Sequence, residues 1–290
     1  MSTPTPATTE VHRLAEGPFW DAARERLLWV DIEAGAVLMG ALDGGALRVL
    51  ERHGFDGMVG AVVAAEDGTL LVAGQESLVV QHLDGSREVG PRIVPSGARR
   101  RLNDGSTDPA GRFLVGTLPL GDPSESEVLV RVDGAGVTEI DADLTLSNGL
   151  AWSPDGSRMY SVDTERQLVY VREYDAATGE TGERRVHLRL ERGHPDGIAM
   201  DAEEHLWVAV WGEGEVRRYS PTGEVVERLR VPAPHSSCVA FAGPDLRTLV
   251  ITTGTSQLDD EQLAAHPDSG RLFTARVDVP GVPVPYWAGF

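Results

Sequence analysis

Four oxygen-bearing side chains recur at one position of a repeated pattern, and each stands just before a glycine. They occur in the pairs and triplets Glu16-Gly17, Asn103-Asp104-Gly105, Asn148-Gly149 and Asp196-Gly197. Asn-Gly and Asp-Gly are ordinary turn signals, so each of these sequences alone predicts a surface turn. Their common spacing from the strand that follows favours another interpretation, in which the side chains converge on one ligand.

The donors in this set are carboxylate and amide oxygens, with no thiolate and no required imidazole. Hard oxygen ligands favour Ca²⁺, Mg²⁺ or Mn²⁺, and two carboxylates with an amide oxygen suit the flexible Ca²⁺ shell well. Zinc also accepts carboxylates and stays open as an alternative. We therefore expect one divalent metal ion, with Ca²⁺ preferred, on Glu16, Asn148 and Asp196, and Asn103 nearby.

A repeated unit of about 45 residues sets this spacing. Each unit has a polar turn with Asp, Pro or Gly, followed by a short strand of large apolar residues. The central strand residues, separated by 42, 43, 46, 47 and 43 positions, are Trp29, Leu71, Leu114, Tyr160, Trp207 and Val250. The four oxygen-bearing residues precede four of these by 11 to 13 positions, and the same step in the other two units reaches Met58 and Ser237 or Cys238.

Six such units predict an all-β fold, a six-bladed β-propeller with four antiparallel strands per blade and a central channel holding the metal. Ankyrin, tetratricopeptide and leucine-rich units are shorter, and the Gly-His and Trp-Asp landmarks of WD40 repeats do not recur. A β-sandwich with evenly spaced turns is the remaining alternative. We expect one propeller domain over residues 11–290, a mobile N-terminus over residues 1–10, and a two-turn helix in a loop over residues 258–266.

Composition excludes several functions. A net charge of −19 opposes nucleic acid and anionic membranes. The chain has no lysine, which removes P-loop and Schiff-base chemistry. The single Cys238 cannot form an internal disulfide, and no apolar run approaches the roughly 20 residues of a membrane helix. We expect a soluble cytoplasmic protein with a small-molecule substrate and no obligate protein partner.

Five motifs, in this order along the chain, resemble the SMP-30/gluconolactonase/luciferin-regenerating-enzyme (regucalcin-like) family. They are LAEGPFW (14–20), RLNDGSTDPAGRF (101–113), LSNGLAWSPDG (146–156), HPDGIAMDAEEHLWVAVWG (194–212) and HSSCVAFAGPDLRTLVITT (235–253). The resemblance implies a six-bladed propeller that hydrolyses sugar lactones at a divalent metal ion. It places the metal on Glu16, Asn148 and Asp196 and substrate contacts on Arg101 and Asn103. It also implies that residues 11–13 pair with a strand at 271–277 to close the ring.

One segment departs from the family pattern. Leu118-Pro119-Leu120 replaces the Met and acidic residues that animal members carry in a lid over the substrate, which leaves the sugar open.

For the reaction, we expect Asp196 to act as the general base toward water and Arg101 to bind substrate oxygens. Asp104 is expected either to orient the neighbouring site residues or to be a plain turn residue. Ser147 and His194 are expected to be structural residues at turns or strand edges, and Cys238 a small core residue. An aryl-ester or organophosphate hydrolase on the same site, and a non-catalytic metal-dependent binding or regulatory propeller, are the alternatives.

Overall fold

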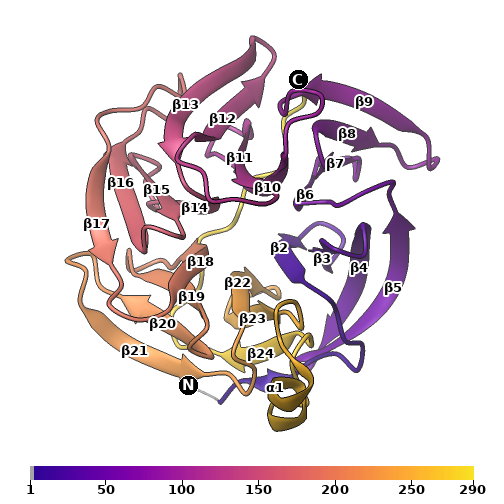
Figure 1. The fold of residues 1–290 in the computed structure, drawn as a ribbon, viewed down its shortest axis with the longest axis vertical. Coiled ribbons are helices and arrows are strands. Elements are labelled where there is room, and N and C mark those ends of the chain that lie inside the picture. The colour runs from indigo at the N-terminus through magenta and orange to yellow at the C-terminus, as the bar shows by residue number, and fades with distance from the viewer. Residues whose placement is uncertain (1–2) are drawn as a thin grey trace.

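Short strands build six four-stranded antiparallel sheets in the computed structural model, which describes residues 3–290. The sheets stand around a central channel as the blades of a propeller (Figure 1). The strands that line the channel are β2 (Ala15–Asp21), β6 (Ala61–Ala64), β10 (Arg100–Thr107), β14 (Ser147–Trp152), β18 (His194–Met200) and β22 (Ser236–Ala242). The predicted all-β, six-bladed fold is confirmed.

The other strands follow outward in each blade. The second strands are β3 (Arg26–Asp31), β7 (Leu70–Ala73), β11 (Phe113–Pro119), β15 (Arg158–Asp163), β19 (Leu206–Trp211) and β23 (Thr248–Thr253). The third strands are β4 (Ala36–Asp43), β8 (Ser77–Gln81), β12 (Glu127–Asp133), β16 (Leu168–Glu173), β20 (Glu215–Tyr219) and β24 (Phe273–Arg276). The outermost are β5 (Ala46–Gly54), β9 (Arg87–Arg92), β13 (Gly136–Leu144), β17 (Arg185–Arg189), β21 (Val225–Arg230) and β1 (Thr5–Pro6).

The hydrophobic core lies between neighbouring blades, which explains the apolar second strands. All six residues used to align the repeats fall in second strands and are at most 1% exposed. A strand packed against blades on both of its faces must be apolar at successive positions, whereas the outermost strands carry many exposed polar side chains. The repeated apolar pattern of the sequence therefore marks the strands that are buried on both faces.

The last blade is completed by the N-terminal strand β1. Thr5 pairs with Thr274 and Pro6 with Phe273, so β1 is the outermost strand of this sheet. The expectation that residues 11–13 pair with the 271–277 strand is wrong. A fourth strand lies about 14 Å from the first, and residues 7–14 are needed to cross back from β1 to the start of β2. Residues 5–8 are thus attached to the last blade, and the propeller extends further toward the N-terminus than residue 11.

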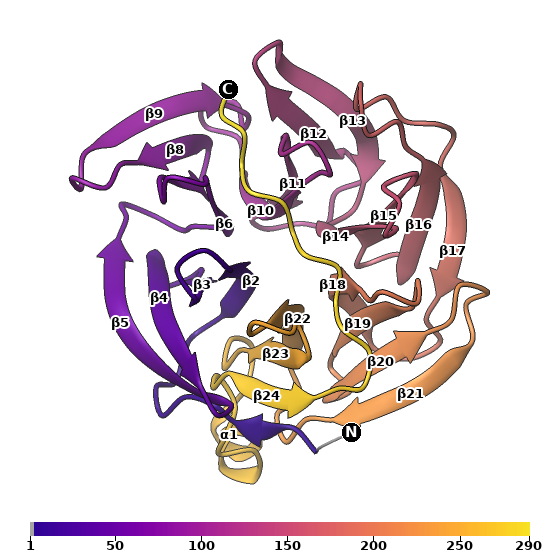
Figure 2. The same cartoon turned by 180° about the vertical axis from the view of Figure 1, so that it is seen from behind.

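The C-terminal residues 280–287, which we call the strap, cross the channel at the end opposite to the first residues of the inner strands (Figure 2). The strap is bonded to the last two blades through Gly281 N to Leu246 O at 2.8 Å and Val282 N to Met200 O at 2.9 Å. Across the channel, Trp287 N donates to Ala64 O at 2.9 Å. One end of the channel is therefore bridged by the chain itself.

A single short helix interrupts the β structure of residues 3–290. Helix α1 (Asp260–Ala265) begins with a capping box between Asp259 and Gln262 and lies within the predicted two-turn segment. No helix in the described part of the chain is long and apolar enough to span a membrane.

Candidate metal centre

β-Bulges interrupt five of the six inner strands at the positions that were predicted to carry the site. The register against the second strand shifts between Glu16 and Phe19, Leu102 and Gly105, Asn148 and Leu150, Pro195 and Ile198, and Ser236 and Cys238. The pairing of β6 with β7 shows no shift, and this blade carries Met58 at the equivalent position. A bulge turns a side chain out of the strict alternation of a strand, so it can aim one into the channel.

The glycines that follow the site residues let neighbouring inner strands approach closely. A Cβ atom on Gly149 would lie 2.6 Å from the carbonyl oxygen of Asp196, and one on Gly197 would lie 2.1 Å from Cys238 Sγ. These Asn-Gly and Asp-Gly pairs lie within strands, where they narrow the channel, and not in surface turns. The repeated glycines thus allow the inner strands that carry the site residues to pack closely against each other.

The amide of Asn148 has a defined orientation. Thr164, the first residue after β15, donates its hydroxyl hydrogen to Pro195 O at 2.9 Å, so its oxygen is left to accept from Asn148 Nδ2 at 3.1 Å. The amide oxygen Oδ1 of Asn148 therefore points the other way, and it is buried without a hydrogen-bond partner. Asp196 Oδ1 is also buried and unpartnered. Two buried acceptors without donors are costly unless a cation or water meets them.

Three carboxyl groups share this desolvated region. Burial and the nearby Asp104 raise the pKa of Glu16 to about 8. Burial and the charges of Glu16 and Asp104 raise the pKa of Asp196 well above its ordinary value. Burial also raises the pKa of Asp104 to about 6. The charge of Arg101 acts on both Glu16 and Asp196, and burial lowers the pKa of Arg101 to about 10.

The charge balance of this cluster fits a divalent cation. When all groups are ionised, three carboxylates and one guanidinium leave two negative charges among buried side chains. No group of three or more His, Cys, Asp or Glu side chains within residues 3–290 is arranged to hold a metal ion. A site here would therefore combine Glu16 and Asp196 with the amide oxygen of Asn148, which is a hard-ligand set.

Arg101 and Asn103 lie beside these residues and bond to each other. Arg101 Nη1 donates to Asn103 Oδ1 and to Leu102 O, both at 2.8 Å, while Asn103 Nδ2 donates to Ser147 O at 2.9 Å. Asn103 thus bridges β10 to β14 and holds Arg101. Of the run Arg99-Arg100-Arg101, Arg101 alone is buried, at 5% exposure.

The remaining candidates have other surroundings. Asp104 lies within β10 and faces the channel beyond the site, so it is not a turn residue. Ser147 packs against Gly116 of β11, where an added Cβ would lie 2.1 Å from its hydroxyl. His194 Nδ1 is 3.2 Å from Thr164 O, and Cys238 is buried against Gly197. Thr164 was missed by sequence reasoning because it lies far from Asn148 along the chain and only the hairpin brings them together.

At this end of the channel lie the segment Leu118-Pro119-Leu120 and an aromatic pair. Leu118 pairs with Arg101 across β10 and β11, and Leu118, Pro119 and Leu120 are all partly exposed. Trp211, at the end of β19, stacks on His235 with ring centroids 3.9 Å apart. Apolar and aromatic surfaces therefore border the polar site.

The chain resembles known proteins over nearly its whole length. Residues 14–255 match the sequence model of the SMP-30/Gluconolactonase/LRE-like region. The chain is 36% identical over 286 residues to 6-deoxy-6-sulfogluconolactonase of Pseudomonas putida, with 95% of each chain covered. It is 34% identical over 278 residues to pentonolactonase XacC of Haloferax volcanii, with 93% of each covered. The crystal structure of a calcium-binding protein, regucalcin, from Agrobacterium tumefaciens matches with a TM-score of 0.92 and 29% identity, covering 99% of this chain and 97% of the other.

Proposed function

Because the chain belongs to the SMP-30/gluconolactonase/LRE-like family, we propose that it is a divalent-metal-dependent hydrolase that opens sugar lactones. The observation that carries this proposal is the pair of buried, unpartnered oxygens, Asn148 Oδ1 and Asp196 Oδ1, beside the charged cluster of Glu16 and Arg101. The relatives named for a sulfogluconolactone and a pentonolactone support the reaction. The calcium-binding neighbour supports Ca²⁺ as the ion.

Glu16, Asn148 and Asp196 would hold the cation, and a bound divalent ion would supply Lewis-acid polarisation of the lactone carbonyl. Asn148 presents its oxygen because Thr164 holds the other end of the amide. Arg101 uses one guanidinium nitrogen, Nη1, for both of its internal bonds, so its other nitrogens are the donors we assign to substrate oxygens. Asn103 positions Arg101 by accepting a hydrogen bond from its Nη1 atom, and we assign Asn103 a contact with the substrate as well.

Asp196 is the proposed general base. A water molecule adds to the carbonyl carbon while Asp196 takes its proton, and the bond between this carbon and the ring oxygen then breaks. The ring oxygen leaves as a hydroxyl after receiving the proton from Asp196, so the product is the open-chain acid. The positive charge of Arg101 acts to lower the pKa of Asp196, and a bound cation would lower it further, which would favour the ionised form that a base requires.

The test is to strip the protein with a chelator, restore Ca²⁺, Mg²⁺, Mn²⁺ or Zn²⁺, and follow proton release from a panel of aldonolactones. We expect activity only after metal is restored. Asp196→Asn should lower kcat about 10²- to 10⁴-fold, whereas Asp84→Asn, at an exposed turn, should have no effect. Full activity in the chelated protein, or in Asp196→Asn, would refute the proposal.

A second candidate is an aryl-ester or organophosphate hydrolase on the same site. The partly exposed Leu118 and Leu120 favour it, because an apolar lid suits an aromatic leaving group better than a polyol. Adding aromatic esters and phosphotriesters to the panel decides between the two by their kcat/KM values. Metal binding without turnover of any compound would instead indicate a binding or regulatory propeller.

A further inference from the structure

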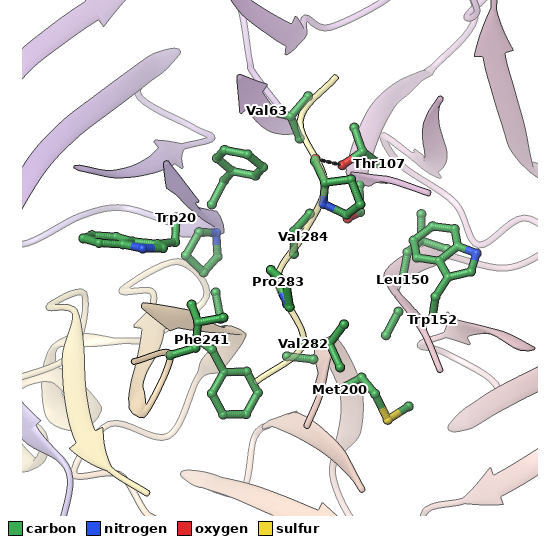
Figure 3. A pocket seen from close by; sticks show the side chains of 18 of the residues that line it. Trp20, Val63, Thr107, Leu150, Trp152, Met200, Phe241, Val282, Pro283 and Val284 are labelled. Atoms are coloured by element: carbon green, nitrogen blue, oxygen red, sulfur yellow. Dashed lines mark hydrogen bonds between the residues drawn. The ribbon is translucent and has the colours of Figure 1, made fainter. Parts of the chain in front are cut away.

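We call the carboxyl groups of Glu16, Asp104 and Asp196 the carboxylate layer. Beyond this layer, the channel continues as a second space, which we call the lower chamber. Its volume is about 780 Å³, and Gly17, Asp104 and Cys238 line it next to the candidate metal centre. Its walls are apolar and aromatic and come from the inner strands of several blades. They include Val63, Leu150, Trp152, Met200 and Phe241 (Figure 3). Phe19 also lines the chamber.

The strap forms the far wall of the lower chamber. Val282, Pro283 and Val284 pass across it in Figure 3. The hydroxyl of Thr107 donates a hydrogen bond to the carbonyl oxygen of Pro285. The prolines have no N–H group, so this stretch crosses the space with few donors to satisfy. Some lining residues are exposed to solvent on both sides of the strap. They lie in the turns after β2 and after β14 and are Ala22, Glu25, Pro154 and Asp155. The lower chamber is thus reached from the side of the molecule opposite to the lid.

We propose that the lower chamber is a second ligand site, which binds an uncharged, mainly apolar molecule carrying a hydroxyl or another hydrogen-bond donor at one end. Its volume lies within the usual range of small-molecule sites. Cavities with apolar walls bind apolar molecules in preference to water. The ligand's apolar body would lie among Phe19, Leu150 and Phe241, away from the carboxylate layer.

The charges around the lower chamber favour a neutral ligand. The groups beside the inner end of the lower chamber are the carboxyl groups of Glu16, Asp104 and Asp196 and the guanidinium of Arg101. With the cation of the proposed function bound, their charges would cancel, so an ionic ligand would lose its hydration without meeting an opposite charge. This step rests on the proposed function, because it needs the bound cation. Asp104 accepts one backbone bond, from Gly105 N at 2.8 Å, which leaves acceptor capacity for the donor end of the ligand.

The experiment is titration calorimetry of the full-length protein with Ca²⁺ present, using three naphthalene probes. We expect 2-naphthol to bind, 2-methoxynaphthalene to bind about tenfold more weakly because it lacks the donor, and 2-naphthoate not to bind. A saturating lactone product should not displace 2-naphthol. Absence of binding at about 1 mM probe, equal binding of 2-naphthoate, or displacement by the product would overturn the proposal.

Two substitutions locate the binding. Leu150→Trp places a larger ring in the lower chamber and should weaken 2-naphthol binding at least tenfold, whereas Leu118→Trp, at the opposite end of the channel, should change it less than twofold. If Leu150→Trp does not fold, Met200→Phe serves as the second filling variant. Binding that survives in a folded filling variant would place the probe elsewhere and refute the site. Naphthol binding without lactone turnover would refute the proposed function while retaining the lower chamber.

Discussion

Thr164→Val should weaken metal binding without touching a proposed ligand. Valine has nearly the same shape as threonine, and residue 164 is 7% exposed, so packing changes little. The substitution removes the acceptor of Asn148 Nδ2 and the donor to Pro195 O. Asn148 can then rotate its amide and present its NH₂ group toward the cation. Because a residue that orients a ligand typically contributes 10- to 100-fold in metal affinity, we expect a loss of about 1.4–2.7 kcal/mol.

The assay is Ca²⁺ titration against a chromophoric chelator, with two control variants. Thr164→Ser keeps the hydroxyl and should bind Ca²⁺ like the wild type. Thr252→Val removes a fully buried hydroxyl, which bonds to Ser237 Oγ at 2.9 Å in a blade without a proposed ligand. It should lower the free energy of unfolding by about 1–3 kcal/mol while leaving Ca²⁺ affinity unchanged. A Thr164→Val protein that binds within twofold of wild type would refute the orientation of Asn148, and so would an equal loss in Thr252→Val.

Three further predictions concern stability. The metal-free protein should lose stability as pH rises from about 4.5 toward 8, because buried Glu16 keeps a proton that the unfolded chain releases; urea unfolding across this range should show the slope, and saturating Ca²⁺ should reduce it. Gly197→Ala should lower the free energy of unfolding by about 1–3 kcal/mol, since the new Cβ meets Cys238 Sγ; unchanged urea unfolding would contradict the close approach. Tyr286→Phe should cost about 1–2 kcal/mol because its hydroxyl bonds to Asp21 Oδ1 at 2.7 Å and Ala23 N at 2.8 Å, with kcat for a lactone unchanged; a lower kcat would mean that the strap affects the site.

The repeat and its phase were predictable because each blade must bury its second strand on both faces. Trp29 and Trp207 mark the same strand in different blades, so their common offset to Glu16 and Asp196 carries structural information. The role of the glycines was not predictable in this way. Gly197 reads as a turn residue in sequence, and only the arrangement of neighbouring blades shows that it faces Cys238.

Features that depend on contacts between segments distant in the chain could not be predicted from the sequence. Thr164 acts on Asn148 through a hairpin, and the short strand at Thr5–Pro6 has too few residues to show alternation. The strap alternates Val and Pro over residues 282–285, but proline cannot donate to a strand ladder, so this pattern predicts no strand, and these residues form neither helix nor sheet. Its course is set by bonds to residues from several blades, none of which is close to it in sequence.

Closure of the ring by β1 also dictates the order in which the molecule can be completed. Blades made of consecutive strands can form as the chain emerges from the ribosome, but Thr5 can pair with Thr274 only after the chain has been synthesised past residue 274. Joining segments so far apart in sequence is a slow, late event. The strap follows β24 in the chain, so its last anchor, Trp287, reaches Ala64 after that. The strand β1 and the strap therefore take their places last, and a nascent propeller keeps both its outer edge and its lower chamber open until residue 287 has been synthesised.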